Sequence, residues 1–145
     1  MRSILTLTVF SLLLPYSMNA FSLGENHAMR NSAPKGITDA FYKCTDRAGG
    51  DIVALGQCTT AEKRVQDARL NKAYSALMGK LGEGGKTHLR EAERAWIVFN
   101  AKSVDTELDV RSDEKTANID VSVNEIYRYA DRASVLEGLL SIVSD

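Results

Sequence analysis

Apolar residues recur at helical spacing in two stretches between residues 57 and 108. At about 100° per residue, the first stretch places one set of side chains on a single stripe. This stripe comprises Asp67, Leu70, Asn71, Tyr74, Leu77, Met78 and Leu81. The matching stripe of the second stretch comprises Leu89, Ala92, Glu93, Trp96, Phe99 and Asn100. A glycine-rich turn separates the two, so the pattern predicts a long antiparallel helical hairpin whose stripes face each other.

The turn between the hairpin helices is expected to be loose, because three of the residues 82–85 are glycine. Gly82 is expected to end the first helix after Leu81, since glycine adopts the left-handed conformation of a C-cap without a steric penalty. Thr87 is expected to cap the second helix, which spans about residues 88–108.

Two signals compete for the start of the first hairpin helix. Asp51 can cap a short lead-in helix. Thr59 and Glu62 instead have the spacing of a capping box that begins immediately after Cys58. These signals leave open whether one helix runs through Cys58 or breaks there.

A further helix is expected on each side of the hairpin. The first spans about residues 37–48 and ends at two glycines. Its buried face comprises Ile37, Phe41, Cys44 and Ala48. The last helix is expected to begin with a capping box of Ser122 and Glu125, flanked by Val121 and Ile126 as a hydrophobic staple. Its apolar seam comprises Ile126, Tyr129, Ala133, Leu136, Leu140 and Val143.

No segment shows the alternation of a strand over a comparable length, so the expected fold is all-α. It is a small helical bundle built on the hairpin. The aromatic residues expected in its core are Tyr74, Trp96 and Phe99. Polar groups buried between helices need partners, since each unpaired group costs about 1–3 kcal/mol. We therefore expect a core polar cluster of Asp67, Asn71, Glu93 and Arg94.

The same cluster permits a catalytic interpretation, in which Asp67 and Glu93 act as general acid and base. No nucleophile motif, zinc-binding motif or phosphate-binding loop accompanies this pair, and structural ion pairs resemble active sites. The structural interpretation is therefore preferred, with no catalytic residues, no metal and no cofactor. A binding protein is favoured over an enzyme.

The N-terminus has the pattern of a secretory signal peptide. Arg2 supplies a positive charge, an apolar run follows over residues 4–14, and Met18-Asn19-Ala20 offers a cleavage site. The apolar run is too short to span a bilayer, which requires about twenty residues. The expected organisation is a signal peptide over 1–20, a flexible leader over 21–36 and a single helical domain over 37–145. The mature protein is expected to be periplasmic or secreted.

Cys44 and Cys58 are the only cysteines. In an exported chain such a pair is best interpreted as a disulfide. A redox-active pair usually has the spacing Cys-x-x-Cys, and a metal site needs further ligands. The expected disulfide would attach the first helix to the start of the second.

The formal net charge is −1, which argues against nucleic acid as a partner. The charge is nevertheless uneven. Residues 63–102 carry nine basic and four acidic side chains, whereas residues 105–120 carry six acidic and two basic ones. A solvated surface is the simplest explanation. The functional alternative is a mobile acidic loop that docks on a basic partner. Its contact residues would be Asp105, Glu107, Asp109, Asp113 and Glu114.

The central sequence resembles the LprI-like lysozyme-inhibitor family of bacterial envelope proteins, long catalogued as a domain of unknown function. The likeness covers about residues 40–140 and rests on the strings QDARLNKAYSALMGKL and LREAERAWIVF. The matching positions are Cys44, Cys58, Asp67, Leu70, Asn71, Tyr74, Leu89, Arg90, Trp96 and Phe99. This chain departs from the family at Asn100, where an arginine is usual, and at Val104 and Asn124, where a second cysteine pair is expected.

The resemblance implies inhibition of lysozyme-type muramidases by steric occlusion, with a protein as the partner. Three alternatives stay open. The chain can be an immunity protein against a secreted peptidoglycan-degrading toxin, a non-inhibitory envelope adaptor, or a wall-active hydrolase that uses Asp67 and Glu93.

Overall fold

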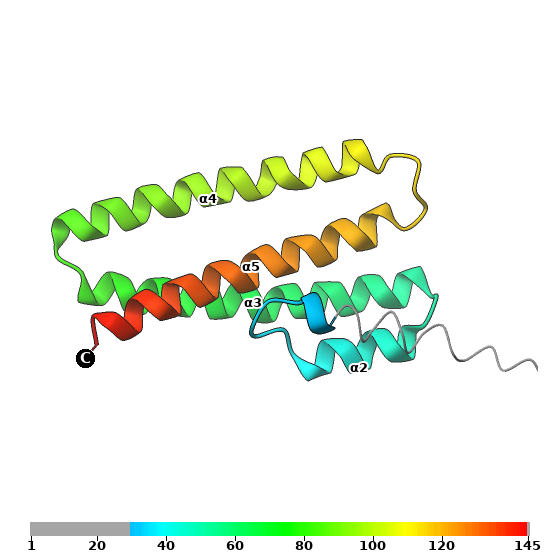
Figure 1. Ribbon diagram of the computed structural model, residues 1–145, viewed down its shortest axis with the longest axis horizontal. Coiled ribbons are helices and arrows are strands. Elements are labelled where there is room, and N and C mark those ends of the chain that lie inside the picture. Colours follow the sequence, from blue (N-terminus) through cyan, green and yellow to red (C-terminus); the bar gives the residue numbers. More distant parts are fainter. Residues whose placement is uncertain (1–29, 145) are drawn as a thin grey trace, which may run out of the picture.

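The computed structural model describes residues 30–144, and all regular structure in that range is helical. The main elements are α2 (Asp39–Ala48), α3 (Ile52–Lys80), α4 (Glu83–Val110) and α5 (Ala117–Ile142) (Figure 1). The prediction of an all-α fold is confirmed. The expected signal peptide and most of the expected leader lie outside the described residues.

The order of the helices in space differs from the expected hairpin. Figure 1 shows α5 running between α4 and α3, with α2 beside the first half of α3. The close packing is between α3 and α5, between α2 and α3, and between α4 and α5. The expected antiparallel hairpin is present, but its two helices do not pack closely along their length. They are consecutive and antiparallel, but α5 provides the main packing surface for both.

The core is divided into two clusters along α5. One lies near the α3–α4 turn and comprises Leu70, Ala73, Leu77, Leu89, Ala133 and Leu136. The other joins α2 to the rest and comprises Phe41, Tyr42, Cys58 and Ile126. Ile126, Ala133 and Leu136 are completely inaccessible to solvent, which confirms most of the predicted α5 seam. Its last member, Val143, is the C-cap of α5 and is 42% exposed.

The helix α3 is continuous through Cys58, which settles the question left open by the sequence. Asp51 is its N-cap, and the Asp51 carboxylate accepts hydrogen bonds from the backbone N–H groups of Val53 and Ala54. The alternative prediction, a helix start with a capping box at Thr59, is wrong. The Thr59 hydroxyl donates to the Gly56 carbonyl within the helix.

The helix α4 begins at Glu83 rather than near His88, so the glycine-rich turn is shorter than expected. Its first turn contains Gly84 and Gly85. The Glu83 carboxylate lies at the positive end of the helix dipole and pairs with Lys86 at 2.8 Å. A favourable charge at the first position thus offsets the low helix propensity of the glycines.

The helix α5 begins at Ala117, five residues before the predicted capping box. Ser122 lies inside the helix and its hydroxyl donates to the Asn118 carbonyl. The Glu125 side chain does not turn back to the backbone, because it binds Lys63 of α3 at 2.8 Å. The predicted start of α5 is therefore wrong. Glu125 of the predicted capping box makes a tertiary contact instead.

The expected disulfide is confirmed. Cys44 and Cys58 are bonded, with their Cα atoms 5.7 Å apart, and they join α2 to α3. Thr38 caps α2, and Gly49 ends this helix with a positive φ of 54°.

The end of the expected flexible leader is packed against the bundle. The Lys35 and Gly36 carbonyls accept hydrogen bonds from Arg69 and Gln66 respectively. Gly36 has φ of 101°, and a Cβ atom there would lie 2.2 Å from the Arg69 guanidinium. Glycine is therefore required at this position. Within residues 30–144, no helix has both the length and the apolar character needed to cross a membrane.

Candidate functional site

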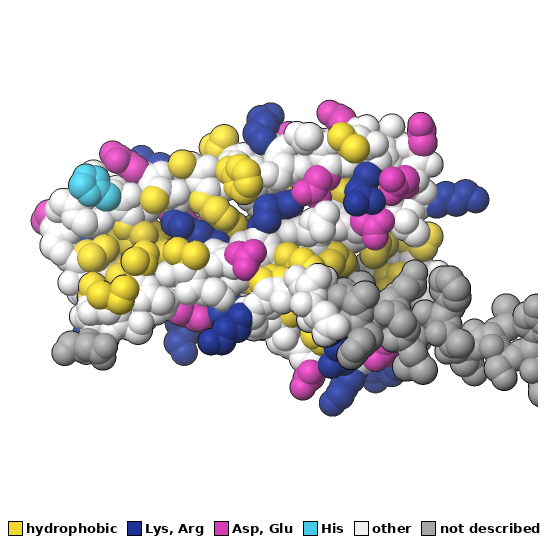
Figure 2. Space-filling view, in the orientation of Figure 1, with side chains coloured by type: hydrophobic (Ala, Val, Ile, Leu, Met, Phe, Trp, Pro, Cys, Tyr) yellow, Lys and Arg dark blue, Asp and Glu magenta, His cyan; other side chains and the backbone are white. Residues whose placement is uncertain are grey.

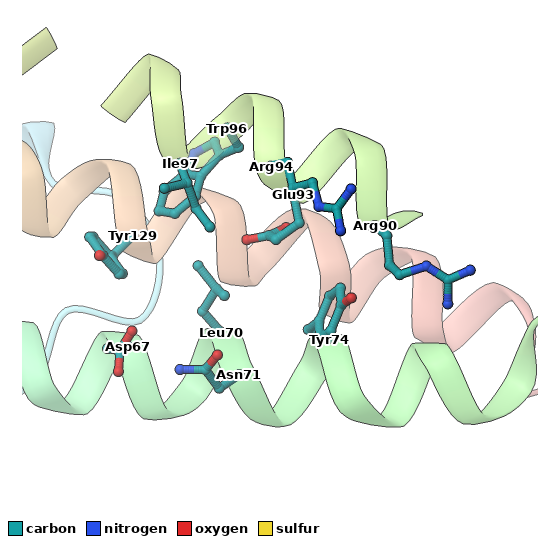
Figure 3. Close-up of a pocket in the computed structure, with 10 residues that line it drawn as sticks. All are labelled: Asp67, Leu70, Asn71, Tyr74, Arg90, Glu93, Arg94, Trp96, Ile97 and Tyr129. Carbon is teal, nitrogen blue, oxygen red and sulfur yellow. The ribbon is translucent and has the colours of Figure 1, made fainter. Parts of the chain in front are cut away.

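An open groove of about 380 Å³ separates α3 from α4 and has α5 as its floor. We call it the α3–α4 groove (Figure 3). Its lining residues from α3 are Asp67, Leu70, Asn71 and Tyr74. Those from α4 are Arg90, Glu93, Arg94, Trp96 and Ile97, and Tyr129 comes from α5. Figure 3 shows side chains of both long helices directed toward the space between them.

Most residues predicted for the polar cluster and the aromatic core therefore lie close together. They line an open groove instead of forming a buried core. Asp67, Asn71 and Arg94 are exposed rather than buried. Within the described part of the chain, their side chains make no hydrogen bond or ion pair with one another. The predicted core polar cluster is thus not formed, because α3 and α4 do not close on each other.

Glu93 has a different partner from the one expected. Arg132 of α5 donates two hydrogen bonds to Glu93 Oε2, from Nε at 3.0 Å and from Nη2 at 2.8 Å. Both side chains are largely buried, with 12% of Glu93 and 17% of Arg132 exposed. Charge-assisted pairs of this kind are stronger than neutral hydrogen bonds. Glu93 therefore attaches α4 to α5 rather than to α3.

The second oxygen of Glu93 is without a partner. Oε1 is buried, and no described residue donates a hydrogen bond to it. A buried acceptor without a donor costs about 1–3 kcal/mol. Glu93 therefore lines the groove with one oxygen committed to Arg132 and the other able to accept a hydrogen bond.

Two of the three predicted core aromatics are partly buried in this region. Trp96 packs edge-to-face on Tyr129, with ring centroids 5.0 Å apart and an interplanar angle of 87°. Tyr74 packs against the neighbouring core cluster. Burial raises the pKa of Tyr129, and the nearby Lys63 ammonium opposes that shift.

The prediction for Phe99 is wrong, because this side chain is 59% exposed. Packing on α5 orients α4 so that Trp96 and Asn100 face the bundle, whereas Phe99 lies toward solvent. Ile97 and Val98 are also more than half exposed. The buried face of α4 is therefore rotated about the helix axis, by part of a turn, from the face that was predicted.

A polar network holds the rest of α4 on α5. Asn100 donates to Glu125 at 3.3 Å and accepts from Arg128 Nε at 2.8 Å. Arg128 also pairs with Glu107, which accepts a further hydrogen bond from Asn124. Sequence reasoning missed Arg128 and Arg132. They are four residues apart on α5 and therefore lie on one face. This spacing was the signal in the sequence that could have identified them as a pair facing α4.

The predicted acidic loop is mostly helical. The residues 105–110 form the last turn and a half of α4, and only 111–116 connect it to α5. Arg111 pairs with Glu114 at 2.8 Å and with Asp120 at 3.5 Å across this connection. Ion pairs and backbone hydrogen bonds cross the turn, so the loop is shorter and more constrained than expected.

The five predicted contact residues fall into two groups. Glu107 is engaged inside the protein by Arg128, and its side chain is 25% exposed. The other four are exposed and form what we call the acidic end. These four are Asp105, Asp109, Asp113 and Glu114. Figure 2 shows acidic side chains gathered at the end of the molecule where α4 meets the turn, with basic side chains among them.

Residues 44–136 match the family model described as Lysozyme inhibitor LprI. The matched segment is more than half of the chain and includes both cysteines, the whole α3–α4 groove and the acidic end. No curated protein and no solved structure matches this chain. By the extent of the family match, the chain belongs to the LprI family of lysozyme inhibitors.

Proposed function

We propose that this protein is an exported inhibitor of lysozyme-type peptidoglycan hydrolases. In this proposal the acidic end occupies the glycan-binding cleft of the enzyme and blocks it sterically. The family match supports the class of target. One structural observation supports the surface. Asp109 and Asp113 are exposed carboxylates without an ion pair among the described residues.

Unpaired carboxylates favour association with a basic partner, because complementary charge speeds encounter and selects the partner. The other two residues of the acidic end are weakly neutralised. Asp105 lies 3.3 Å from Lys102 with 63% of its side chain exposed, and Glu114 is 50% exposed beside Arg111. Exposed pairs of this kind contribute little and are easily exchanged for a partner's charges.

The acidic end is also held in place before binding. Arg128 connects Glu107 to α5 directly below it, and Arg111 crosses the turn. Binding therefore requires little ordering of this segment, which favours affinity.

Export is part of the proposal, because the target is outside the cytoplasm. It rests on the predicted signal peptide over residues 1–20. Mass spectrometry of the protein recovered from the periplasm or culture medium is expected to show an N-terminus near Phe21.

The inhibition proposal is tested by neutralising Asp109→Asn and Asp113→Asn together. Association with a basic muramidase is expected to slow, and its salt dependence to flatten. The matched control is Glu91→Gln with Asp131→Asn, which changes the charge equally at exposed positions outside the acidic end. Stopped-flow binding and an inhibition assay on peptidoglycan provide the readouts. Equal association rates for the two double variants would exclude the acidic end as the contact surface.

A further inference from the structure

We infer that the α3–α4 groove is a binding site for a neutral oligosaccharide. The inference is independent of the acidic end. Trp96 and Asp109 are thirteen residues apart on one helix, which corresponds to about 20 Å. A saccharide in the groove would therefore leave the acidic end accessible.

The first argument is the number of unused polar groups in the groove. The side chains of Asp67, Asn71 and Arg94 make no hydrogen bond or ion pair with any other residue between 30 and 144. Glu93 Oε1 is buried and accepts no hydrogen bond there. Together these groups offer carboxylate and amide acceptors as well as amide and guanidinium donors. Sugar hydroxyls both donate and accept, so they match this mixture.

The second argument is the aromatic surface beside these groups. Tyr74, Trp96 and Tyr129 come from three different helices and all line the groove. Their rings provide flat apolar area with little conformational freedom to lose. Trp96 is held edge-to-face by Tyr129, so its orientation is set before a ligand binds. The carbon–hydrogen faces of a pyranose ring can stack on such a surface.

The third argument is the balance of charge. Glu93 is neutralised by Arg132, so the charges left to a ligand are the Asp67 carboxylate and the Arg90 and Arg94 guanidinium groups. A strongly anionic ligand would meet the carboxylate, and a strongly cationic ligand would meet the arginines. A neutral polyhydroxyl ligand avoids both. The volume of about 380 Å³ lies in the usual range for small-ligand sites, and the open shape admits part of a longer chain.

Trp96 makes the inference directly testable, because it is the only tryptophan of the chain. Its emission therefore reports on the surroundings of the groove. The full-length mature protein is titrated with triacetylchitotriose and, separately, with cellotriose. Both probes are neutral, and only the first carries acetamido groups. A saturable change in Trp96 emission is expected, and calorimetry provides an independent affinity.

Two substitutions at exposed positions test the assignment without disturbing the core. Asn71→Ala and Arg94→Ala are each expected to weaken binding about fivefold to tenfold, as the loss of one hydrogen bond predicts. Ser75→Ala is the matched control, because Ser75 is exposed on α3 but does not line the groove. Circular dichroism verifies that each variant is folded.

The outcomes separate the alternatives. Binding of triacetylchitotriose alone supports an N-acetylated ligand, and equal binding of both probes supports recognition through ring hydroxyls. Absence of saturable binding by either probe at millimolar concentration overturns the inference. It is also overturned if Asn71→Ala and Ser75→Ala bind equally well. Absence of saccharide binding together with weaker muramidase binding by Asn71→Ala and Arg94→Ala would mean that the groove receives a protein segment instead. Because no enzyme is present in the saccharide titrations, their failure leaves the inhibition proposal intact.

Discussion

Glu62, in the middle of α3, accepts hydrogen bonds from both the backbone N–H and the hydroxyl of Thr38, the N-cap of α2. Glu62 is only 3% exposed, and Gln66 donates a third hydrogen bond to it at 2.8 Å. Thr38 in turn caps α2 by accepting from the Phe41 N–H group. One buried carboxylate on α3 thus positions the start of a neighbouring helix that is 24 residues earlier in the chain.

Removal of this carboxylate is expected to loosen α2. Glu62→Ala leaves the Thr38 N–H and the Gln66 amide without their acceptor, which should lower the free energy of unfolding by about 1–3 kcal/mol. Urea denaturation followed by circular dichroism measures the effect. Glu91→Ala, at an exposed position of α4, is the matched control. A similar loss of stability in both variants would contradict the role assigned to Glu62.

Trp96 and Phe99 are close in sequence but should differ in their contribution to stability. Trp96→Ala removes the edge-to-face contact with Tyr129 and should lower the free energy of unfolding by about 3 kcal/mol. Phe99→Ala removes a side chain that is 59% exposed, so it should change the free energy of unfolding by less than about 0.5 kcal/mol. Thermal and urea unfolding of both variants provide the measurement. The reverse order would show that α4 packs through its other face.

Loss of the disulfide should destabilise the attachment of α2. The bond closes a loop with a sequence separation of 14, and replacing both cysteines by alanine should cost about 3 kcal/mol in the chain-entropy model. The wild-type protein in a reducing agent should unfold at nearly the same urea concentration as the double variant. The reducing agent should have no effect on the double variant, and a further shift there would contradict the assignment.

The Arg69–Glu137 pair should make stability depend on pH in the acidic range. Arg69 Nε donates to Glu137 at 2.7 Å, and these hydrogen bonds lower the pKa of Glu137 below its usual 4.5. The unfolded chain therefore takes up this proton at a higher pH than the folded protein does. The stabilisation is present above the unfolded pKa and is lost as the pH falls through the folded one.

Glu137→Gln provides the corresponding test. The variant should be less stable than the wild type at neutral pH, and the two melting temperatures should converge as the pH falls below 4.5 and the wild-type carboxylate is protonated. Differential scanning calorimetry across that range measures the difference. A constant difference at every pH would show that the charge of Glu137 is not responsible.

Features that depend on neighbouring residues in the chain could be predicted. The Asp51 cap needs only its own side chain and the next N–H groups, and Gly49 ends α2 because glycine tolerates a positive φ. The pairing of Cys44 with Cys58 followed from the presence of two cysteines in a chain expected to be exported. Six of the ten residues of the α3–α4 groove could also be named, because helical periodicity places them on two stripes. These six are Asp67, Leu70, Asn71, Tyr74, Glu93 and Trp96.

The partners of those stripes could not be predicted in the same way. Periodicity identifies the face of a helix that is buried or polar, but not the element that covers it. Glu93 was assigned to α3 or to Arg94, whereas Arg132 of α5 binds it. The capping box at Ser122 was misplaced for the same reason, since Glu125 is held by Lys63.

The sequence by itself therefore determined the helical class, the main helices and the disulfide, because these depend on local propensity, local capping and cysteine chemistry. Only the tertiary structure decided that α5 lies between α3 and α4. That placement turns a predicted polar core into an open groove, exposes Phe99 and connects Glu107 to Arg128. Its physical cause is the burial of the apolar seam of α5 against α3 together with the pairing of α5 arginines with α4 carboxylates, contacts between residues far apart in the chain.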